Sequence, residues 1–381
     1  MLFMPIVVPF YMENGLGMKD IMLLQGIYSI TIVVLEIPSG YLADVFGRRK
    51  TLIFGSILGF SGFLCYSFSY GFWGFLVAEI ILGLGQSLIS GADSAILYDT
   101  LLDKKNEKEY IKYDGRITSI GNLSEAVAGI FGGFLAGISL RLPYITQTVV
   151  AFLAIPTAIL LVEPARHIAM KKIYFKDILK IVRYTLYEHK GLQKNILFSA
   201  LIGSATLTMA WFVQPVFLKN NIPIEGFGLL WTLLNLTVGL IAAFAYKIER
   251  RLKQRNSIII IAVFIPLIYI AISYAGLVVS FILLFLFYAI RGFATPVLKD
   301  YINRLADSST RATTLSIRNF IIRLNFALIG PFLGWYTDHY SLSEALFLAG
   351  TIFFTLSMLT MILFLKSLKS YIVRKSAKTK G

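Results

Sequence analysis

Long apolar runs separated by short polar clusters dominate the chain. Eleven of them have the length of about 20 residues that a helix needs to cross the hydrocarbon core of a bilayer. These runs cover approximately 21–43, 51–70, 73–98, 117–140, 143–162, 193–218, 227–246, 257–275, 277–298, 312–336 and 342–365. The pattern predicts an all-α integral membrane protein.

The first apolar stretch, from Met1 to Met12, is shorter than the others. It covers roughly half of a spanning helix. We therefore expect about twelve transmembrane helices, and we expect the printed sequence to begin inside the first of them, with a basic, apolar extension encoded upstream.

Helices are favoured over a β-barrel by the chemistry of the backbone. Lipid offers no partner for N–H and C=O groups, so each spanning segment must satisfy them internally or in a closed barrel. Barrel strands show about ten residues of alternating polarity. Runs such as 257–272 do not alternate, which leaves helices.

The distribution of Lys and Arg predicts the orientation. Of the 36 basic residues, 30 fall in alternate loops and the C-terminal tail, and three lie inside predicted spans. The opposite side holds only Lys19, Arg141 and Lys219. Basic loops stay in the cytoplasm, so we expect a multi-pass protein of the cytoplasmic membrane with a cytoplasmic C-terminus.

The longest polar interruption divides the chain into two halves. Within 163–192, apolar residues recur at helical spacing among basic ones, which predicts an amphipathic linker helix on the inner membrane face. The six-helix halves are then 1–162 and 193–366, followed by a basic cytoplasmic tail, 367–381. Segments 119–122 (Ser-Ile-Gly-Asn) and 316–319 (Ser-Ile-Arg-Asn) echo each other, as expected of parallel repeats in secondary transporters.

Composition supports lipid as the surrounding solvent. Hydrophobic residues make up 57% and charged residues 15%, and the mean hydropathy is +0.73. The net charge of +15 does not indicate a nucleic-acid partner, because the excess sits in short loops between apolar runs. The single cysteine, Cys65, excludes an internal disulfide framework.

The loop after the run at 21–43 reads Gly-Tyr-Leu-Ala-Asp-Val-Phe-Gly-Arg-Arg-Lys over 40–50. The two glycines permit a sharp turn and a close approach of helices. The acid suits a helix N-terminus or a cation, and the arginines can bond carboxylates at another helix end. This loop resembles the signature 2–3 loop of the major facilitator superfamily, and the span count, linker and orientation extend the resemblance over the whole chain.

The resemblance implies a fold of two pseudo-symmetric six-helix halves and a cytoplasmic gate. In that family the loop latches the two halves together when the carrier opens outward. The matching residues here are Gly40, Asp44, Gly47, Arg48 and Arg49. Asp99, at the cytoplasmic end of the run at 73–98, is the expected partner of the arginines.

The resemblance also implies secondary transport of a small solute. The sequence departs from the motifs of proton-coupled family members at two places. Family members that couple to protons often carry Arg before Gly-x-Gly in the fourth span, where this chain has Glu79. The fifth span contains spaced glycines but not the Gly-Pro pair of antiporters. Proton-coupled efflux of a small organic compound is the favoured function. Proton-coupled import, or facilitated passage, of a sugar or organic acid stays open.

Ionisable residues inside the spans are functional candidates, because each is costly in lipid without a cavity or partner. The candidates for proton coupling or substrate binding are Glu36, Asp93, Glu125, Arg291 and Arg323. Glu125 and Arg323 lie near mid-membrane at equivalent positions of the two halves. We expect Glu125 to be the titrating carboxylate and Arg323 its counter-charge or a substrate anchor.

The other candidates receive narrower roles. Asp93 is a second coupling candidate, and Arg291 is expected to face it across the cavity or to pair locally. Glu36, one turn before the signature loop, is assigned to the gate, and Glu79 receives no role.

Other classes of function find little support. The three histidines lie in loops without metal-ligand spacing, and no Gly-x-x-x-x-Gly-Lys-Ser/Thr run indicates a nucleotide site. We expect no metal, no cofactor and no catalytic residue. A polytopic membrane enzyme or sensor is a remote alternative. The expected partners are the lipid bilayer, a small-molecule substrate and protons, and the expected functional form is a monomer.

Overall fold

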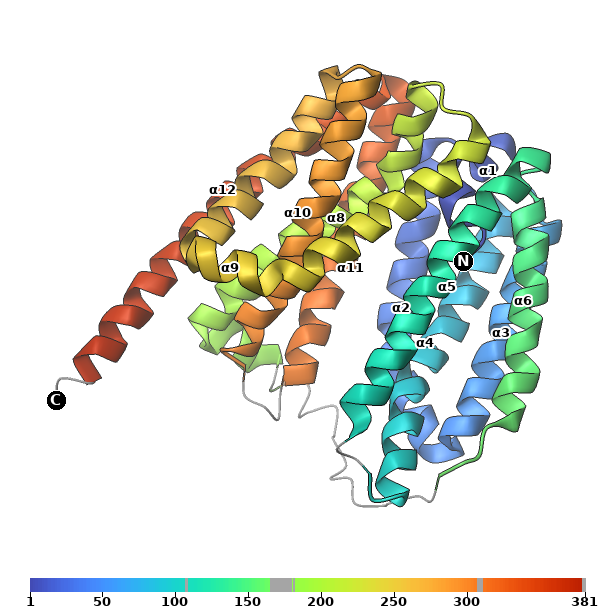
Figure 1. The fold of residues 1–381 in the computed structure, drawn as a ribbon, viewed down its shortest axis with the longest axis horizontal. Coiled ribbons are helices and arrows are strands. Elements are labelled where there is room, and N and C mark those ends of the chain that lie inside the picture. The colour runs from blue at the N-terminus through green and yellow to red at the C-terminus, as the bar shows by residue number, and fades with distance from the viewer. Residues whose placement is uncertain (107–108, 165–179, 181, 307–310, 379–381) are drawn as a thin grey trace. The chain divides into compact units, whose positions relative to one another are not determined.

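A computed structural model describes residues 1–106, 109–164, 180, 182–306 and 311–378. Every regular element in these residues is helical (Figure 1). The chain forms two compact units, one of Met1–Lys171 with Phe217–Thr232 and the other of Lys172–Val216 with Leu233–Gly381. The all-α membrane fold expected from the sequence is confirmed.

The helices follow the predicted spans closely. In chain order they are η1 (Met4–Ile6), α1 (Val7–Glu13), α2 (Met18–Phe46), α3 (Arg48–Phe68), α4 (Gly71–Asp103), α5 (Tyr110–Ile138), α6 (Leu142–Leu160), η3 (Tyr184–Glu188), α8 (Lys190–Lys219), α9 (Ile224–Tyr274), α10 (Leu277–Asn303), α11 (Arg311–His339) and α12 (Leu342–Lys378). Several helices extend beyond the apolar runs, because polar residues continue a helix once its apolar part has formed. Most of the expected linker helix lies outside the described residues.

Helix α9 contains two of the predicted spans. Its 51 residues would reach about 76 Å at 1.5 Å per residue, far more than the roughly 30 Å of a hydrocarbon core. Lys253 interrupts the helix with φ 63° and ψ 160°. Figure 1 shows the yellow ribbon turning back at this end. The predicted spans 227–246 and 257–275 are therefore two separate crossings.

Small residues allow close helix contacts in the first unit. A Cβ atom on Gly85 would lie 3.0 Å from the carbonyl oxygen of Gly55, which brings α4 close to α3. A Cβ atom on Gly83 would lie 2.8 Å from Thr31 of α2. Lipid supplies no hydrophobic driving force between helices, so such van der Waals contact stabilises the bundle.

A close contact joins α5 to the first turns of α9. A Cβ atom on Gly133 would lie 2.8 Å from Gly228, and one on Gly137 would lie 2.5 Å from Glu225. The hydroxyl of Thr232 donates to the carbonyl oxygen of Ala126 at 3.2 Å. The spaced glycines of the fifth span thus form a packing face.

Side chains that reach across helices stabilise the second unit. The Tyr269 hydroxyl donates to the Ala205 carbonyl at 2.6 Å, joining α9 to α8. The Ser357 hydroxyl donates to the Ala262 carbonyl at 2.8 Å, joining α12 to α9. Large apolar side chains remain exposed elsewhere, and ten helices in the described part of the chain are long and apolar enough to cross a membrane. Lipid is the solvent that such surfaces require.

Candidate functional site

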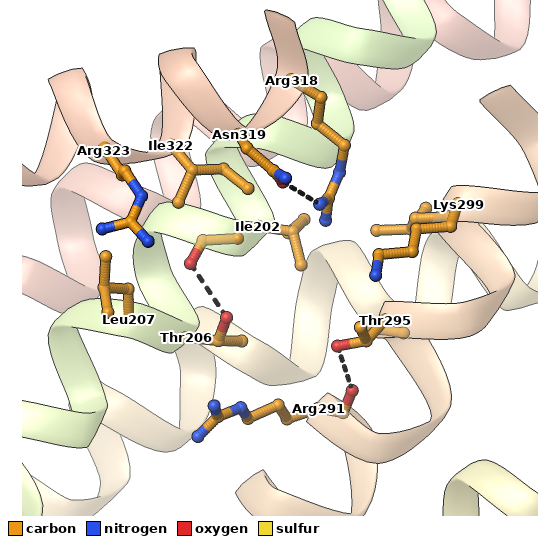
Figure 2. A pocket seen from close by; sticks show the side chains of 13 residues that line it. Ile202, Thr206, Leu207, Arg291, Thr295, Lys299, Arg318, Asn319, Ile322 and Arg323 are labelled. Atoms are coloured by element: carbon orange, nitrogen blue, oxygen red, sulfur yellow. Dashed lines mark hydrogen bonds between the residues drawn. The ribbon is translucent and has the colours of Figure 1, made fainter. Parts of the chain in front are cut away.

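A cavity of about 330 Å³ lies within the second unit, among α8, α10 and α11. Four basic side chains surround it (Figure 2). They are Arg291 and Lys299 of α10 and Arg318 and Arg323 of α11. Two of them, Arg291 and Arg323, are among the site residues predicted from ionisable positions inside the apolar runs.

Helical periodicity brings these groups to one place. Arg291, Thr295 and Lys299 are spaced by four residues and form a stripe on one face of α10. On α11, Arg318 and Arg323 are five residues apart and both line the cavity. Helix α10 continues to Asn303, so Lys299 lies in a helix and not in the loop where the apolar run alone had placed it.

Neutral groups hold Arg318 in position. Its side chain is buried, and Nε donates to the Ser199 hydroxyl at 2.5 Å. Its Nη1 donates to the amide oxygen of Asn319 at 3.1 Å. The Thr206 and Thr295 hydroxyls donate to backbone carbonyl oxygens of their own helices, each at 2.9 Å. None of these contacts neutralises the charge of the guanidinium group.

Acidic side chains do not line the cavity. None of the described lining residues is Asp or Glu. The five described acidic residues after position 190 stand at or near helix ends or near the break in α9: Glu225, Glu249, Asp300, Asp338 and Glu344. Asp300 pairs with Arg304 at 2.5 Å, and Glu249 accepts from the Tyr301 hydroxyl at 2.9 Å. Among the described lining residues, the positive charges of the cavity therefore have no acidic counterpart.

The signature loop lies in the first unit, where α2 ends and α3 begins. Gly47 has φ 104°, a conformation that favours glycine. Arg48 Nε lies 3.4 Å from Asp99 Oδ2 of α4, so the structure brings these two residues together. Gly40, Asp44 and Glu36 belong to α2, but the side chains of the two acids are outside what the structure describes. The gating role of the loop stays a prediction.

Glu163, which sequence analysis did not single out, organises the same loop. Its two carboxylate oxygens accept from the backbone N–H groups of Arg48 at 2.7 Å and Arg49 at 2.8 Å. A carboxylate at a helix N-terminus satisfies donors that have no partner within the helix. Arg49 in turn donates to the Ile159 carbonyl at the end of α6, at 2.6 Å. The more than one hundred intervening residues leave no local sequence signal for this contact.

The acidic candidates of the first unit lie on exposed positions. Asp93 is exposed on α4, and Glu125 is exposed on α5. Arg323 and Arg291, their expected counterparts, belong to the other unit. The coupling role of Glu125 and both expected pairings stay predictions.

Glu79 is the acid that the structure places in a specific environment. It is buried inside the first unit, where the Tyr11 hydroxyl donates to its Oε1 at 2.8 Å. The Gln25 side-chain amide donates to the same oxygen. Its partners come from α1 and α2, so sequence spacing alone could not reveal the cluster. Within the described residues, no group of three His, Cys, Asp or Glu side chains could hold a metal ion.

Known proteins resemble this chain in sequence over parts of its length. An uncharacterised transporter of Buchnera aphidicola (subsp. Schizaphis graminum) is 35% identical over 115 residues, which is 30% of this chain and 29% of that protein. The class H tetracycline resistance protein of Pasteurella multocida is 28% identical over 153 residues, which is 40% of this chain and 35% of that one. The matches thus span about a third of the length of these relatives.

Solved structures resemble the whole fold. The nucleoside transporter NupG has a TM-score of 0.77 at 14% identity, and the match covers 95% of both chains. Identity this low establishes the fold alone. The sequence profile described as Major Facilitator Superfamily matches residues 1–325, which is most of the chain. This match confirms the family that the signature loop resembles. The chain belongs to the Major Facilitator Superfamily.

Proposed function

We propose that this protein is a secondary transporter that moves a small organic anion across the membrane by alternating access. The cavity of the second unit is the proposed binding site. The observation that carries the proposal is the set of four basic side chains around one cavity with no acidic residue among its described lining.

The electrostatics of the cavity favour a negatively charged ligand. A cation inside a membrane protein is costly unless it meets a counter-charge or water. The acids of the same half stand at helix ends, so a bound anion supplies the missing charge. Arginine presents a planar fork of donors that matches carboxylate and phosphate oxygens. The ligand we propose therefore carries a carboxylate or phosphate group.

The size of the cavity fits a small solute. Its 330 Å³ lies near the lower end of ligand pockets, which are about 300 to 1,000 Å³. Ile202, Leu207 and Ile322 add apolar surface to the polar lining. Such a lining accommodates a compact organic body together with its charged group, and it favours an organic acid over an uncharged sugar.

Export in exchange for protons is the form of transport that we propose. The sequence resemblance favours efflux, and the tetracycline resistance relative supports it. An inside-negative membrane potential drives anions outward by about 2.3 kcal/mol per charge for every ~100 mV. Import by proton symport is the second candidate, and the positive cavity favours it only for an acidic substrate.

Glu125 and Asp93 are the coupling candidates from the sequence. Both side chains lie at exposed positions of the first unit, and coupling requires that one of them reach water at some stage of the cycle. In the proposed mechanism, Glu125→Gln abolishes proton movement while the fold is retained. Full proton-coupled transport by that variant would contradict the assignment.

Transport in proteoliposomes tests the substrate class. Vesicles with the purified protein are loaded with carboxylates, phosphate esters, uncharged sugars or organic amines, and solute loss and internal pH are followed together. Only anions should leave and cause a pH change. Arg323→Gln removes a charge-assisted contact of about 1.5 to 3 kcal/mol, which should raise the half-saturating concentration roughly ten- to a hundredfold.

Arg311→Gln is the matched control on the same helix. Arg311 is exposed at the first residue of α11 and does not line the cavity. Its replacement should leave the half-saturating concentration unchanged. Transport of sugars or amines that is insensitive to Arg323→Gln would contradict the anion proposal.

A further inference from the structure

Glu79 is a carboxyl group to which the proposed anion site gives no role. It is 4% exposed and lies inside the first unit, apart from the cavity residues of the second. It follows the first residue of α4, Gly71, by eight positions, which places it about 12 Å from that end of the helix. The distribution of basic residues predicts that this end faces outside.

Neutral hydrogen-bonding groups from three other helices surround the carboxyl group. The Tyr11 hydroxyl of α1 donates to Oε1 at 2.8 Å, and the Gln25 amide of α2 donates to the same atom. The Tyr66 hydroxyl of α3 lies 2.5 Å from the Tyr11 hydroxyl, and either atom can be the donor. Tyr66 thereby extends the hydrogen-bonded chain by one group.

A fourth helix contributes a tyrosine without a partner. Tyr144 of α6 stacks on Tyr66 with ring centroids 5.2 Å apart. Its hydroxyl is buried and has no hydrogen-bond partner among the described residues. Most buried polar atoms in proteins are hydrogen-bonded, so this free hydroxyl marks a place that can take or give a proton or hold a water molecule.

Arg141, a cation at the nearest end of the bundle, is engaged by other groups. Its guanidinium group donates to the carbonyl oxygens of Ser67 at 2.9 Å and Ser69 at 3.0 Å. It also donates to Asn14 Oδ1 at 2.7 Å and stacks on the ring of Tyr70. Among the described residues, no basic side chain forms an ion pair with Glu79.

This environment accommodates the carboxyl group in two protonation states. A buried carboxylate without a cation is costly, although hydrogen bonds reduce the cost. A tyrosine hydroxyl can donate to a carboxylate or accept from a carboxylic acid. The Tyr11–Tyr66 pair can reverse its direction without moving either ring. A static ion pair, with a fixed cation beside the acid, would lack this freedom.

Access is shorter from one end of α4 than from the other. Tyr66 stands two residues before the end of α3 at Phe68, next to the turn that carries the exposed Tyr70. The opposite end of α4, Asp103, lies 24 residues beyond Glu79, which corresponds to about 36 Å. The shorter path for a proton to Glu79 therefore starts at the predicted outer end of α4.

We propose that Glu79, with Tyr11, Tyr66 and Gln25, forms a proton-binding site that is loaded from the outer end of the first unit. The use of this proton to drive anion export rests on the proposed function, whereas proton binding itself does not. Because its partners lie on α1, α2 and α3, a change of charge at Glu79 alters the hydrogen bonds that join these helices to α4. The protonated and deprotonated forms of Glu79 can therefore favour different arrangements of these helices, which a transporter can use to change conformation.

Proton counting on the purified protein tests the site without any substrate. Wild type and Glu79→Gln are titrated in unbuffered detergent solution, and the number of bound protons is compared. The wild type should bind one proton more than the variant near the pH at which transport is assayed. Glu344→Gln is the control, because Glu344 is exposed at the start of α12 and belongs to the second unit. Coincident curves of wild type and Glu79→Gln near the working pH would overturn the proposal.

Tyr66→Phe keeps the carboxyl group and provides a second route if Glu79→Gln does not fold. Loss of the Tyr66 hydroxyl should shift the pH at which the extra proton is half bound, because the neighbouring Tyr11 hydroxyl loses its hydrogen bond to Tyr66. An unchanged midpoint would overturn the proposed site.

Coupling is then tested in proteoliposomes. Glu79→Gln should retain anion-for-anion exchange and lose the associated pH change, while retained proton movement would refute a coupling role. A failure of anion transport in wild type leaves the proton-counting result intact, so the two proposals fail separately.

Discussion

The contact between α5 and the first turns of α9 gives the sharpest stability prediction. A Cβ atom on Gly228 would lie 2.3 Å from the carbonyl oxygen of Gly129 and 2.9 Å from the Cα atom of Gly133. Both neighbours are backbone atoms and cannot rotate away. Gly228→Ala therefore forces the helices apart by about 1 Å before ordinary contact distances are restored.

Gly239 is the matched control on the same helix. A Cβ atom there would meet nothing within 4 Å. Alanine in an open helical position is favoured over glycine by about 0.5 to 1 kcal/mol, whereas overpacking costs about 1 to 3 kcal/mol. The two variants should thus change stability in opposite directions and differ by about 1.5 to 4 kcal/mol.

Thermal unfolding in detergent, followed by intrinsic fluorescence at a fixed heating rate, measures the difference. Gly228→Ala should lower the apparent Tm by several degrees, and Gly239→Ala should leave it unchanged or raise it. The fixed rate matters because unfolding of membrane proteins is often irreversible. Equal Tm values for the two variants would refute the close backbone contact at Gly228.

Two further stability predictions follow from particular backbone contacts. Glu163→Gln removes the charge and one acceptor from the pair of bonds to the N–H groups of Arg48 and Arg49, and it should cost about 1 to 2 kcal/mol of stability; an unchanged Tm would show that the carboxylate does not cap α3. Lys253 adopts φ 63° and ψ 160°, a region that costs residues other than glycine about 1 to 3 kcal/mol. Lys253→Gly should therefore raise the Tm, and a lower Tm would contradict strain at this break in α9.

Some of the cationic site could be predicted from the sequence and some could not. Arg291 and Arg323 stand near the middle of long apolar runs, and the cost of charge in lipid makes them candidates without any structure. Lys299 was assigned to a loop because the apolar run ends before it, while the helix continues to Asn303. Arg318 lies in a predicted span, but only the packing of α11 on α8 shows that it faces the same cavity.

From the sequence alone, the fold class, the family and the approximate positions of most spanning helices could be predicted. The length of an apolar run and the spacing of a signature loop can be read directly along the sequence. They indicate the fold because only helices and closed barrels can span a lipid bilayer. The sequence could not determine which face of each helix meets which neighbour. That rotation depends on side-chain packing between segments far apart in the chain. Tertiary structure therefore decided that Glu163 caps α3, that four cations share one cavity, and that Glu79 meets Tyr11 and Gln25 in the interior of the first unit.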